Sequence, residues 1–147
     1  MGNYRDCVVA VIVNEEGLIL SGERSDRPGI WQLPQGGVDE GETAREALFR
    51  ELREEIGTAD LEILVELPDK ISYDFPETMT APIAKKFKGQ TQTWFKLKLK
   101  SGAQPSLEDS DHEFQDLTWL SAESLLKGVV AWKKKAYEIG FKRLSLT

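Results

Sequence analysis

The segment "TAREALFRELREEIG", residues 43 to 57, constrains the fold more than any other part of this chain. Thr43 and Glu46 match a Thr-x-x-Glu capping box, in which two side chains satisfy free amides at a helix N-terminus. The run that follows is rich in strong helix formers, and Gly57 is a natural C-terminal stop. The sequence therefore predicts a helix that opens at Thr43 and ends at Gly57.

Three glutamates crowd one side of this predicted helix. At about 100° per residue, Glu51, Glu54 and Glu55 fall within an arc of roughly 100° that borders the apolar stripe. Two like charges about 4 Å apart repel by roughly 4 kcal/mol at an effective dielectric near 20. Arg50 can reach Glu46 and Glu54 at helical spacing but lies outside the arc. The three carboxylates therefore need compensation from protons or metal ions.

Hard divalent cations, Mg2+ or Mn2+ foremost, are the expected compensation. Bound Mg2+ usually completes its shell with water and substrate phosphates, so a phosphate-containing ligand is expected as well. Gly36, Gly37 and Gly41 allow the preceding loop to bend and bring its backbone to the same site. The open alternatives are a solvated acidic face balanced by arginines for the helix, and an ordinary turn for the glycines.

The remaining chain alternates between strand and helix patterns. Strands are expected at residues 7–13, 18–22, 31, 61–67, 91–100 and 116–120. The turn sequence "NEEG" between the first two predicts a β-hairpin, and residues 25–42 predict a long loop. Ser121 should cap a short helix, and residues 129–141 should form the last one. This order predicts an α/β or α+β sandwich with a mixed sheet.

Composition narrows the class of protein further. The chain has 147 residues, so we expect one domain over residues 1–147. Its net charge of −6 argues against a partner such as duplex nucleic acid, and no apolar run is long enough for a membrane span. Cys7 is the only cysteine and is expected to be buried and inert. The lack of a disulfide framework is compatible with a cytoplasmic location.

Basic residues are concentrated in two places. Six lysines and no acidic residue lie between residues 83 and 100, and "KKK" recurs at 133–135. Such islands in an acidic protein could hold a small anionic ligand or one end of a polymer. The alternative is that they only solubilise a strand and a helix.

Residues 36–58 resemble the Nudix box, GX5EX7REUXEEXGU, in which U is a bulky aliphatic residue. The matching positions are Gly36, Glu42, Arg50, Glu51, Leu52, Glu54, Glu55 and Gly57. Only Thr58 departs from the pattern, at a position that usually packs an apolar side chain. The resemblance implies a Nudix-type α/β/α sandwich with a mixed sheet. It also implies hydrolysis of a nucleoside diphosphate linked to another group.

The resemblance extends beyond the box to a subgroup of the family. The stretches "WQLPQGGVDEGE", "YDFP", "GQTQTWF" and "VVAWKKKAY" are similar to RNA pyrophosphohydrolases and dinucleoside polyphosphate hydrolases. The implied reaction is removal of pyrophosphate from 5′-triphosphorylated RNA, or cleavage of a dinucleoside polyphosphate such as diadenosine tetraphosphate. The alternatives are a hydrolase that sanitises modified nucleoside triphosphates and a non-catalytic sensor of nucleotides or RNA ends. The sequence does not specify an oligomeric state.

The same resemblance implies roles for the acidic residues. Glu54 and Glu55 would bind metal, and Glu51 would bind metal or act as general base on an activated water. Gly36 would offer its backbone carbonyl to a metal. Glu113 resembles a distal carboxylate that serves as another ligand or as the alternative base, although an acidic loop is usually just solvated.

Supporting and substrate-binding residues are implied in the same way. Arg50 and Glu42 would form a pair that orients the catalytic helix. The candidates for phosphate or base contacts are Arg5, Arg27, Lys88, Gln92 and Lys133. Trp132 and Tyr73 could stack on a base, worth about 1 to 3 kcal/mol, or could simply fill the core and a loop.

Overall fold

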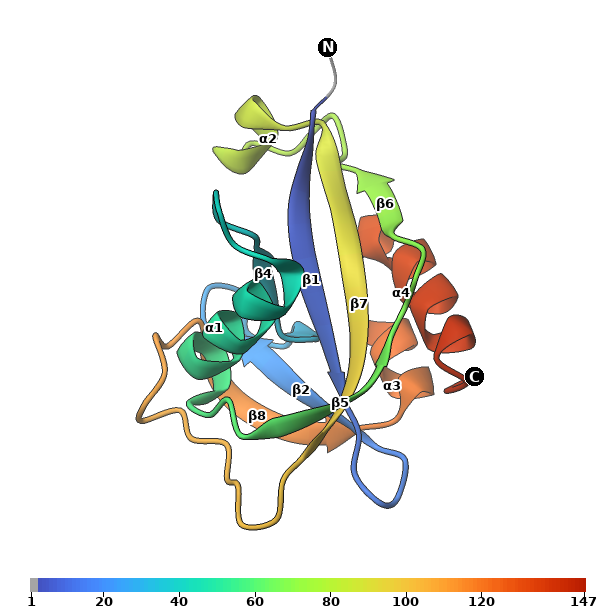
Figure 1. Ribbon diagram of the computed structural model, residues 1–147. Helices are drawn as coiled ribbons and strands as arrows, with labels where there is room; N and C mark the ends of the chain where they lie inside the picture. Colours follow the sequence, from blue (N-terminus) through green and yellow to red (C-terminus); the bar gives the residue numbers. More distant parts are fainter. Residues whose placement is uncertain (1–2) are drawn as a thin grey trace.

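The larger of two sheets organises the computed structural model, which describes residues 3–147 (Figure 1). Its strand order is β4-β1-β7-β5, and β6 pairs with β7 beside β5. The strands β1 and β7 are parallel and the other pairs are antiparallel, so the sheet is mixed as predicted. Its strands are β1 Tyr4–Ile12, β4 Gln35–Gly37, β5 Leu61–Glu66, β6 Ile71–Asp74 and β7 Gly89–Leu99.

A smaller sheet has the order β3-β2-β8, with β2 Ile19–Arg24, β3 Trp31–Gln32 and β8 Phe114–Leu120. The predicted hairpin between β1 and β2 is confirmed only at its turn, where one isolated antiparallel bridge joins Val13 to Ile19. Beyond this bridge the two strands separate, and β2 pairs with β8 in the smaller sheet. The turn forms as expected, with the Asn14 side chain accepting from the amides of Glu16 and Leu18.

The long helix predicted from the capping box is confirmed as α1, Ala44–Ile56. Thr43 and Glu46 cap its first turn reciprocally, and Gly57 ends it with a left-handed φ of 74°. The other helices are α2 Ile83–Lys86, α3 Ala122–Gly128 with Ser121 as its cap, and α4 Ala131–Arg143. Within residues 3–147, no helix is both long and apolar enough to cross a bilayer.

Alternation along β1 builds two separate cores. Val8, Ala10 and Ile12 face α1, whereas Val9 and Val11 face α3 and α4 on the opposite side of the sheet. Figure 1 shows α1 on one face of the larger sheet and α4 on the other. The predicted α/β/α sandwich is therefore confirmed, because β1 and β7 are buried on both faces.

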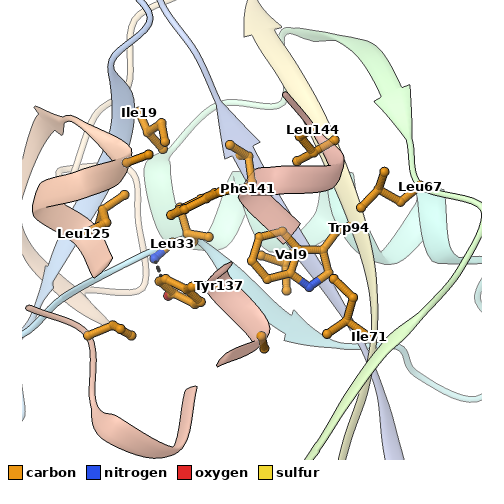
Figure 2. Close-up of a cluster of buried hydrophobic side chains, with 14 residues drawn as sticks. Val9, Ile19, Leu33, Leu67, Ile71, Trp94, Leu125, Tyr137, Phe141 and Leu144 are labelled. Atoms are coloured by element: carbon orange, nitrogen blue, oxygen red, sulfur yellow. Dashed lines mark hydrogen bonds between the residues drawn. The ribbon is translucent and has the colours of Figure 1, made fainter. Parts of the chain in front are cut away.

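The core under α4 is built around Trp94, which the sequence alternation puts on the same face as lysines. The indole is fully buried and makes edge-to-face contacts with Tyr137 and Phe141 (Figure 2). Gly140 is necessary at this crossing, because a Cβ there would overlap the indole ring. Because α4 packs on this face, β7 is buried on both faces around Trp94. Lys98, near the end of the strand, remains exposed.

Replacing Tyr137 with phenylalanine is expected to destabilise the protein by about 1 to 3 kcal/mol. The Tyr137 hydroxyl accepts a hydrogen bond from the buried backbone amide of Leu33 at 3.1 Å (Figure 2), and phenylalanine would leave that amide without a partner. Urea unfolding measures the loss. The control is Tyr4→Phe, which removes an exposed hydroxyl bonded to Asp74, and an equal loss in both variants would contradict the argument.

Candidate active site

The helix α1, the strand β4 and the loop before β8 enclose a cavity of about 250 Å³, which we call the acidic pocket. Its wall includes four carboxylates, one arginine and one glycine. These are Glu51, Glu54, Asp111, Glu113, Arg5 and Gly36. The structure thus brings Glu113 beside the helix although it lies more than fifty residues away in the sequence. Asp111 was not predicted, because nothing distinguishes it within the acidic loop.

Gly36 creates the space for one of these carboxylates. In β4 it pairs with Val8 of β1, which fixes the strand against α1. A Cβ at this position would overlap the carboxyl group of Glu51. A side chain at residue 36 is therefore excluded by the position of Glu51 and not by the backbone conformation, since φ there is not positive.

Arg50 connects the loop to the helix. Its guanidinium donates to both oxygens of Glu42, at 2.7 and 2.9 Å, and to the carbonyl of Gly37 at 2.8 Å. It also donates to Glu51 at 2.8 Å and lies 3.4 Å from Glu54. These contacts lower the pKa of Glu42 to about 2, chiefly through the hydrogen bonds from Arg50.

The expected contact of Arg50 with Glu54 is confirmed, whereas the expectation that no cation compensates Glu51 is wrong. An arginine side chain is long enough to leave its own helical sector, so Arg50 reaches Glu51 and Glu54 together. Its predicted partner Glu46 is instead engaged in the capping box with Thr43. Of the three glutamates, Glu55 is the one that has no ionic partner among the described residues.

Glu55 is a fully buried carboxyl group. One oxygen accepts from the amide of Gln35 at 3.1 Å, and the other has no hydrogen-bond partner among the described residues. Burial raises its pKa well above the usual range, and the carboxylates of Glu113 and Glu51 raise it further. Burial also raises the pKa of Glu51, to about 7, against the opposing effect of Arg50. Both groups are costly to leave charged and unpaired.

The distal carboxylate is positioned by the loop that leads into β8. The backbone amide of Asp111 donates to the carbonyl of Glu54, at 2.6 Å, and this contact ties the loop to α1. The carbonyl of Glu113 accepts from the amide of Ser25 at 3.0 Å. Desolvation and the neighbouring Asp111 raise the pKa of Glu113. The backbone of this loop is therefore tied to α1, while the side chains of Asp111 and Glu113 stay exposed.

A second cavity of about 260 Å³ adjoins the first and shares Arg5, Gln35 and Gln90 with it. We call it the aromatic pocket, because the rings of Tyr73, Phe75 and Trp132 pack together on its wall. The centroids of Tyr73 and Trp132 are 5.5 Å apart, and those of Phe75 and Trp132 are 5.9 Å apart. The alternative that Trp132 belongs to the core is wrong, since its ring is only partly buried and lines this cavity.

Cations surround the aromatic rings. Arg5, Arg24, Arg27 and Lys133 line the same cavity, and Arg5 lies at its junction with the acidic pocket. Phe75 and Arg24 were not predicted as site residues. The "YDFP" stretch contains Phe75, but nothing in the sequence alone separates a pocket aromatic from a loop aromatic.

Two predicted substrate contacts lie outside both cavities. Lys88 pairs with Asp74 at 3.8 Å and lies over the ring of Tyr4. Gln92 is buried, accepts from the indole N–H of Trp94 at 3.0 Å and lies 3.3 Å from Gln90. The structure therefore places Gln92 behind the pocket wall, where it can orient Gln90.

Lys133 is a buried lysine on the wall of the aromatic pocket. Its ammonium group lies 3.3 Å from the side-chain oxygen of Gln32 and 5.1 Å from the centroid of the Trp132 ring. Burial lowers its pKa to about 8, and the positive charge of Arg24 lowers it further.

Lys133→Met is expected to change how stability depends on pH. Between about pH 8 and 10.5 the unfolded chain binds a proton at this lysine that the folded chain has lost, so folding stability rises with pH. The full rise is about 3 kcal/mol, and the variant lacks it. The free energy of unfolding from pH 7 to 10 measures the difference from wild type. The control Lys134→Met removes an exposed lysine, and parallel curves for wild type and Lys133→Met would contradict the prediction.

Comparison with known proteins identifies the class. A model described as the NUDIX domain matches residues 3–138. An RNA pyrophosphohydrolase of Campylobacter jejuni subsp. doylei is 42% identical over 142 residues, covering 92% of this chain and 88% of the relative. The E. coli dihydroneopterin triphosphate pyrophosphohydrolase has a TM-score of 0.71, with 23% identity and coverage of 93% and 96%. A C. elegans Ap4A hydrolase complex has a TM-score of 0.68, with 22% identity and coverage of 96% and 98%.

The mixed sheet between α1 and α4 defines the fold class, and the glycine loop with its glutamate helix defines the type of site. The chain belongs to the Nudix family and is a Nudix hydrolase.

Nudix hydrolases generally use divalent metal ions, and the residues of the acidic pocket fit such an ion. The buried oxygen of Glu55 lacks a partner, and the gap at Gly36 brings backbone close to the Glu51 carboxylate. Within residues 3–147, no three potential ligands converge into a preformed metal centre. The Arg50 guanidinium contacts Glu51 and Glu54 together.

Proposed function

We propose that this chain hydrolyses the polyphosphate of a 5′-triphosphorylated RNA end and releases pyrophosphate. The observation that carries the proposal is that the two pockets adjoin at Arg5, so that a polyphosphate in the acidic pocket would continue to a base in the aromatic pocket. The name of the C. jejuni relative, at 42% identity, supports the same substrate.

Glu51, Glu54, Glu55 and the carbonyl of Gly36 would hold Mg2+ or Mn2+, with Glu113 as a further ligand. Oxygen donors of this kind suit hard divalent cations. When bound, such an ion lowers the pKa of water and neutralises charge on the polyphosphate. The unpartnered oxygen of Glu55 supports this assignment, because a buried carboxylate otherwise lacks compensation.

The attacking water needs a base, and Glu51 is proposed for that role. Its carboxylate lines the acidic pocket, where an attacking water would lie, and without a metal ion burial raises its pKa to about 7. The water oxygen forms the new bond to phosphorus, the bond to the leaving phosphate oxygen breaks, and the proton passes to the carboxylate. Glu113 is the alternative base, since it lines the same cavity.

The other residues are proposed to position the substrate and the helix. Arg50 and Glu42 hold the glycine loop against α1 through the paired hydrogen bonds at 2.7 and 2.9 Å. Arg5 and Arg27 would contact phosphates, and Lys133 would contact a phosphate or the base. A base would stack on Trp132 and Tyr73, with about 1 to 3 kcal/mol from stacking.

The test compares two substrates under the same conditions. Purified protein is incubated with Mg2+ and either 5′-triphosphorylated RNA or diadenosine tetraphosphate, and the products are separated by chromatography. Faster pyrophosphate release from RNA is the expected result. Preferred cleavage of diadenosine tetraphosphate into ATP and AMP would mean that the protein acts mainly on dinucleoside polyphosphates. No turnover of either would favour a sanitising hydrolase or a non-catalytic sensor.

A further inference from the structure

The aromatic pocket is bordered by two helices that each carry lysines. Ile83 of α2 and Trp132 of α4 both line the cavity, although they come from distant parts of the chain. Figure 1 shows α2 and β6 at the same end of the larger sheet, and β6 packs against α4 through the contact between Tyr73 and Trp132. A chain that leaves the aromatic pocket between Ile83 and Trp132 would pass near both helices.

One lysine on each helix is separated by three residues from a side chain that lines the pocket. Lys86 follows Ile83 by three residues, and Lys135 follows Trp132 by three. At about 100° per residue, a separation of three returns to within about 60° of the starting direction. Each lysine therefore lies one helical turn from a side chain that lines the pocket, and each is exposed.

The neighbouring lysines provide an internal comparison. Lys85 follows Ile83 by two residues and Lys134 follows Trp132 by two, so each is rotated by about 200° from the pocket direction. Both are exposed and carry the same charge on the same helices. They differ from Lys86 and Lys135 in their rotation from Ile83 and Trp132, although Lys134 also directly follows Lys133, which lines the pocket.

The charge at this border is not neutralised by the protein. Within residues 3–147, no carboxylate lies within 4.0 Å of these four lysines, whereas Lys88 pairs with Asp74 at 3.8 Å. The helix α2 and the first seven residues of α4 contain no acidic residue. The positive charge here contrasts with the net charge of −6 of the whole chain. An anionic partner is the expected complement.

We propose that Lys86 and Lys135 bind the phosphodiester backbone of single-stranded RNA beyond the nucleotide held in the aromatic pocket. The inference rests on the proposed function and deepens it, because it makes the enzyme sensitive to the length of its substrate. An aromatic surface for a base followed by cations for the backbone is the usual arrangement for binding single strands. A dinucleotide is too short to use the second part of this surface.

The experiment measures kcat/KM for two RNAs, a 5′-triphosphorylated dinucleotide and a 5′-triphosphorylated unstructured 12-mer. The variants are Lys86→Gln/Lys135→Gln and the matched control Lys85→Gln/Lys134→Gln. The first is expected to lose about tenfold on the 12-mer at 100 mM salt, mainly through KM, and to stay within twofold on the dinucleotide. The salt dependence for the 12-mer should flatten by about 1.4 in log–log slope, at about 0.7 per phosphate contact.

The outcomes separate this inference from the proposed function. If wild type releases no pyrophosphate from either RNA, the proposed function is overturned and the inference with it. If wild type cleaves both RNAs and the two variants lose equal activity on the 12-mer, the loss comes from a general electrostatic effect. The proposed binding of the RNA backbone by Lys86 and Lys135 is then overturned. The proposal would also be overturned if the ratio of kcat/KM for the 12-mer to kcat/KM for the dinucleotide were unchanged in the Lys86→Gln/Lys135→Gln variant.

Discussion

Glu51→Gln is expected to lower kcat by about 100- to 10,000-fold while the fold remains intact. Glutamine keeps the size of the side chain and can retain a contact with Arg50, but it cannot accept a proton from water. It also weakens the hold on a divalent cation, because an amide carries no negative charge. The measurement is pyrophosphate release at saturating Mg2+, together with a thermal unfolding curve.

The matched control lies on the same helix. Glu46→Gln removes a carboxylate whose place in the capping box a glutamine can take over, so activity should stay near the wild-type value. Near-normal turnover in Glu51→Gln would contradict the proposed general base. The base would then be sought at Glu113, where Glu113→Gln provides the parallel test.

Gly36→Ala is expected to reduce kcat/KM by about 100-fold or more, with little change in stability. The added methyl group would occupy the space of the Glu51 carboxyl group, and the flexible end of that side chain would have to move aside. A displacement of about 1 Å at a reacting group can cost two orders of magnitude in rate. The backbone is not strained, because φ at this glycine is not positive, and its carbonyl is retained.

Gly128→Ala is the control for this substitution. Gly128 is the last residue of α3, and an added Cβ there would meet no atom within 4 Å. Alanine also has the better helix propensity, so this variant should unfold at the same or a higher temperature and keep full activity. Wild-type activity in Gly36→Ala would show that turnover does not depend on the observed position of Glu51.

Local chemistry explains why the helix and the family could be predicted from the sequence. The capping box at Thr43, the stop at Gly57 and the spacing of the glutamates all act over a few residues, so α1 formed with the expected limits. The Nudix resemblance rests on spacing within the same short segment, and the family comparison confirms it. Capping motifs and residue spacings within such a short segment do not depend on how the rest of the chain folds.

Strand pairing could not be predicted in the same way. The turn after Asn14 favours a hairpin locally, but beyond one bridge β2 leaves β1 and pairs with β8. The partners of β1 come from residues 35–37 and 89–97, and pairing over such distances leaves no trace in a short window of sequence. The burial of Trp94 depends in the same way on α4.

The sequence by itself determined α1, the position of the three glutamates on it and the membership of the Nudix family, because each follows from spacing within one helix and its loop. Only the tertiary structure decided that Glu55 is buried with one oxygen unpartnered among the described residues, since that depends on how α1 packs against β4. It also brought Phe75 beside Trp132. These features arise from contacts between distant segments, which form only when both faces of the sheet are packed.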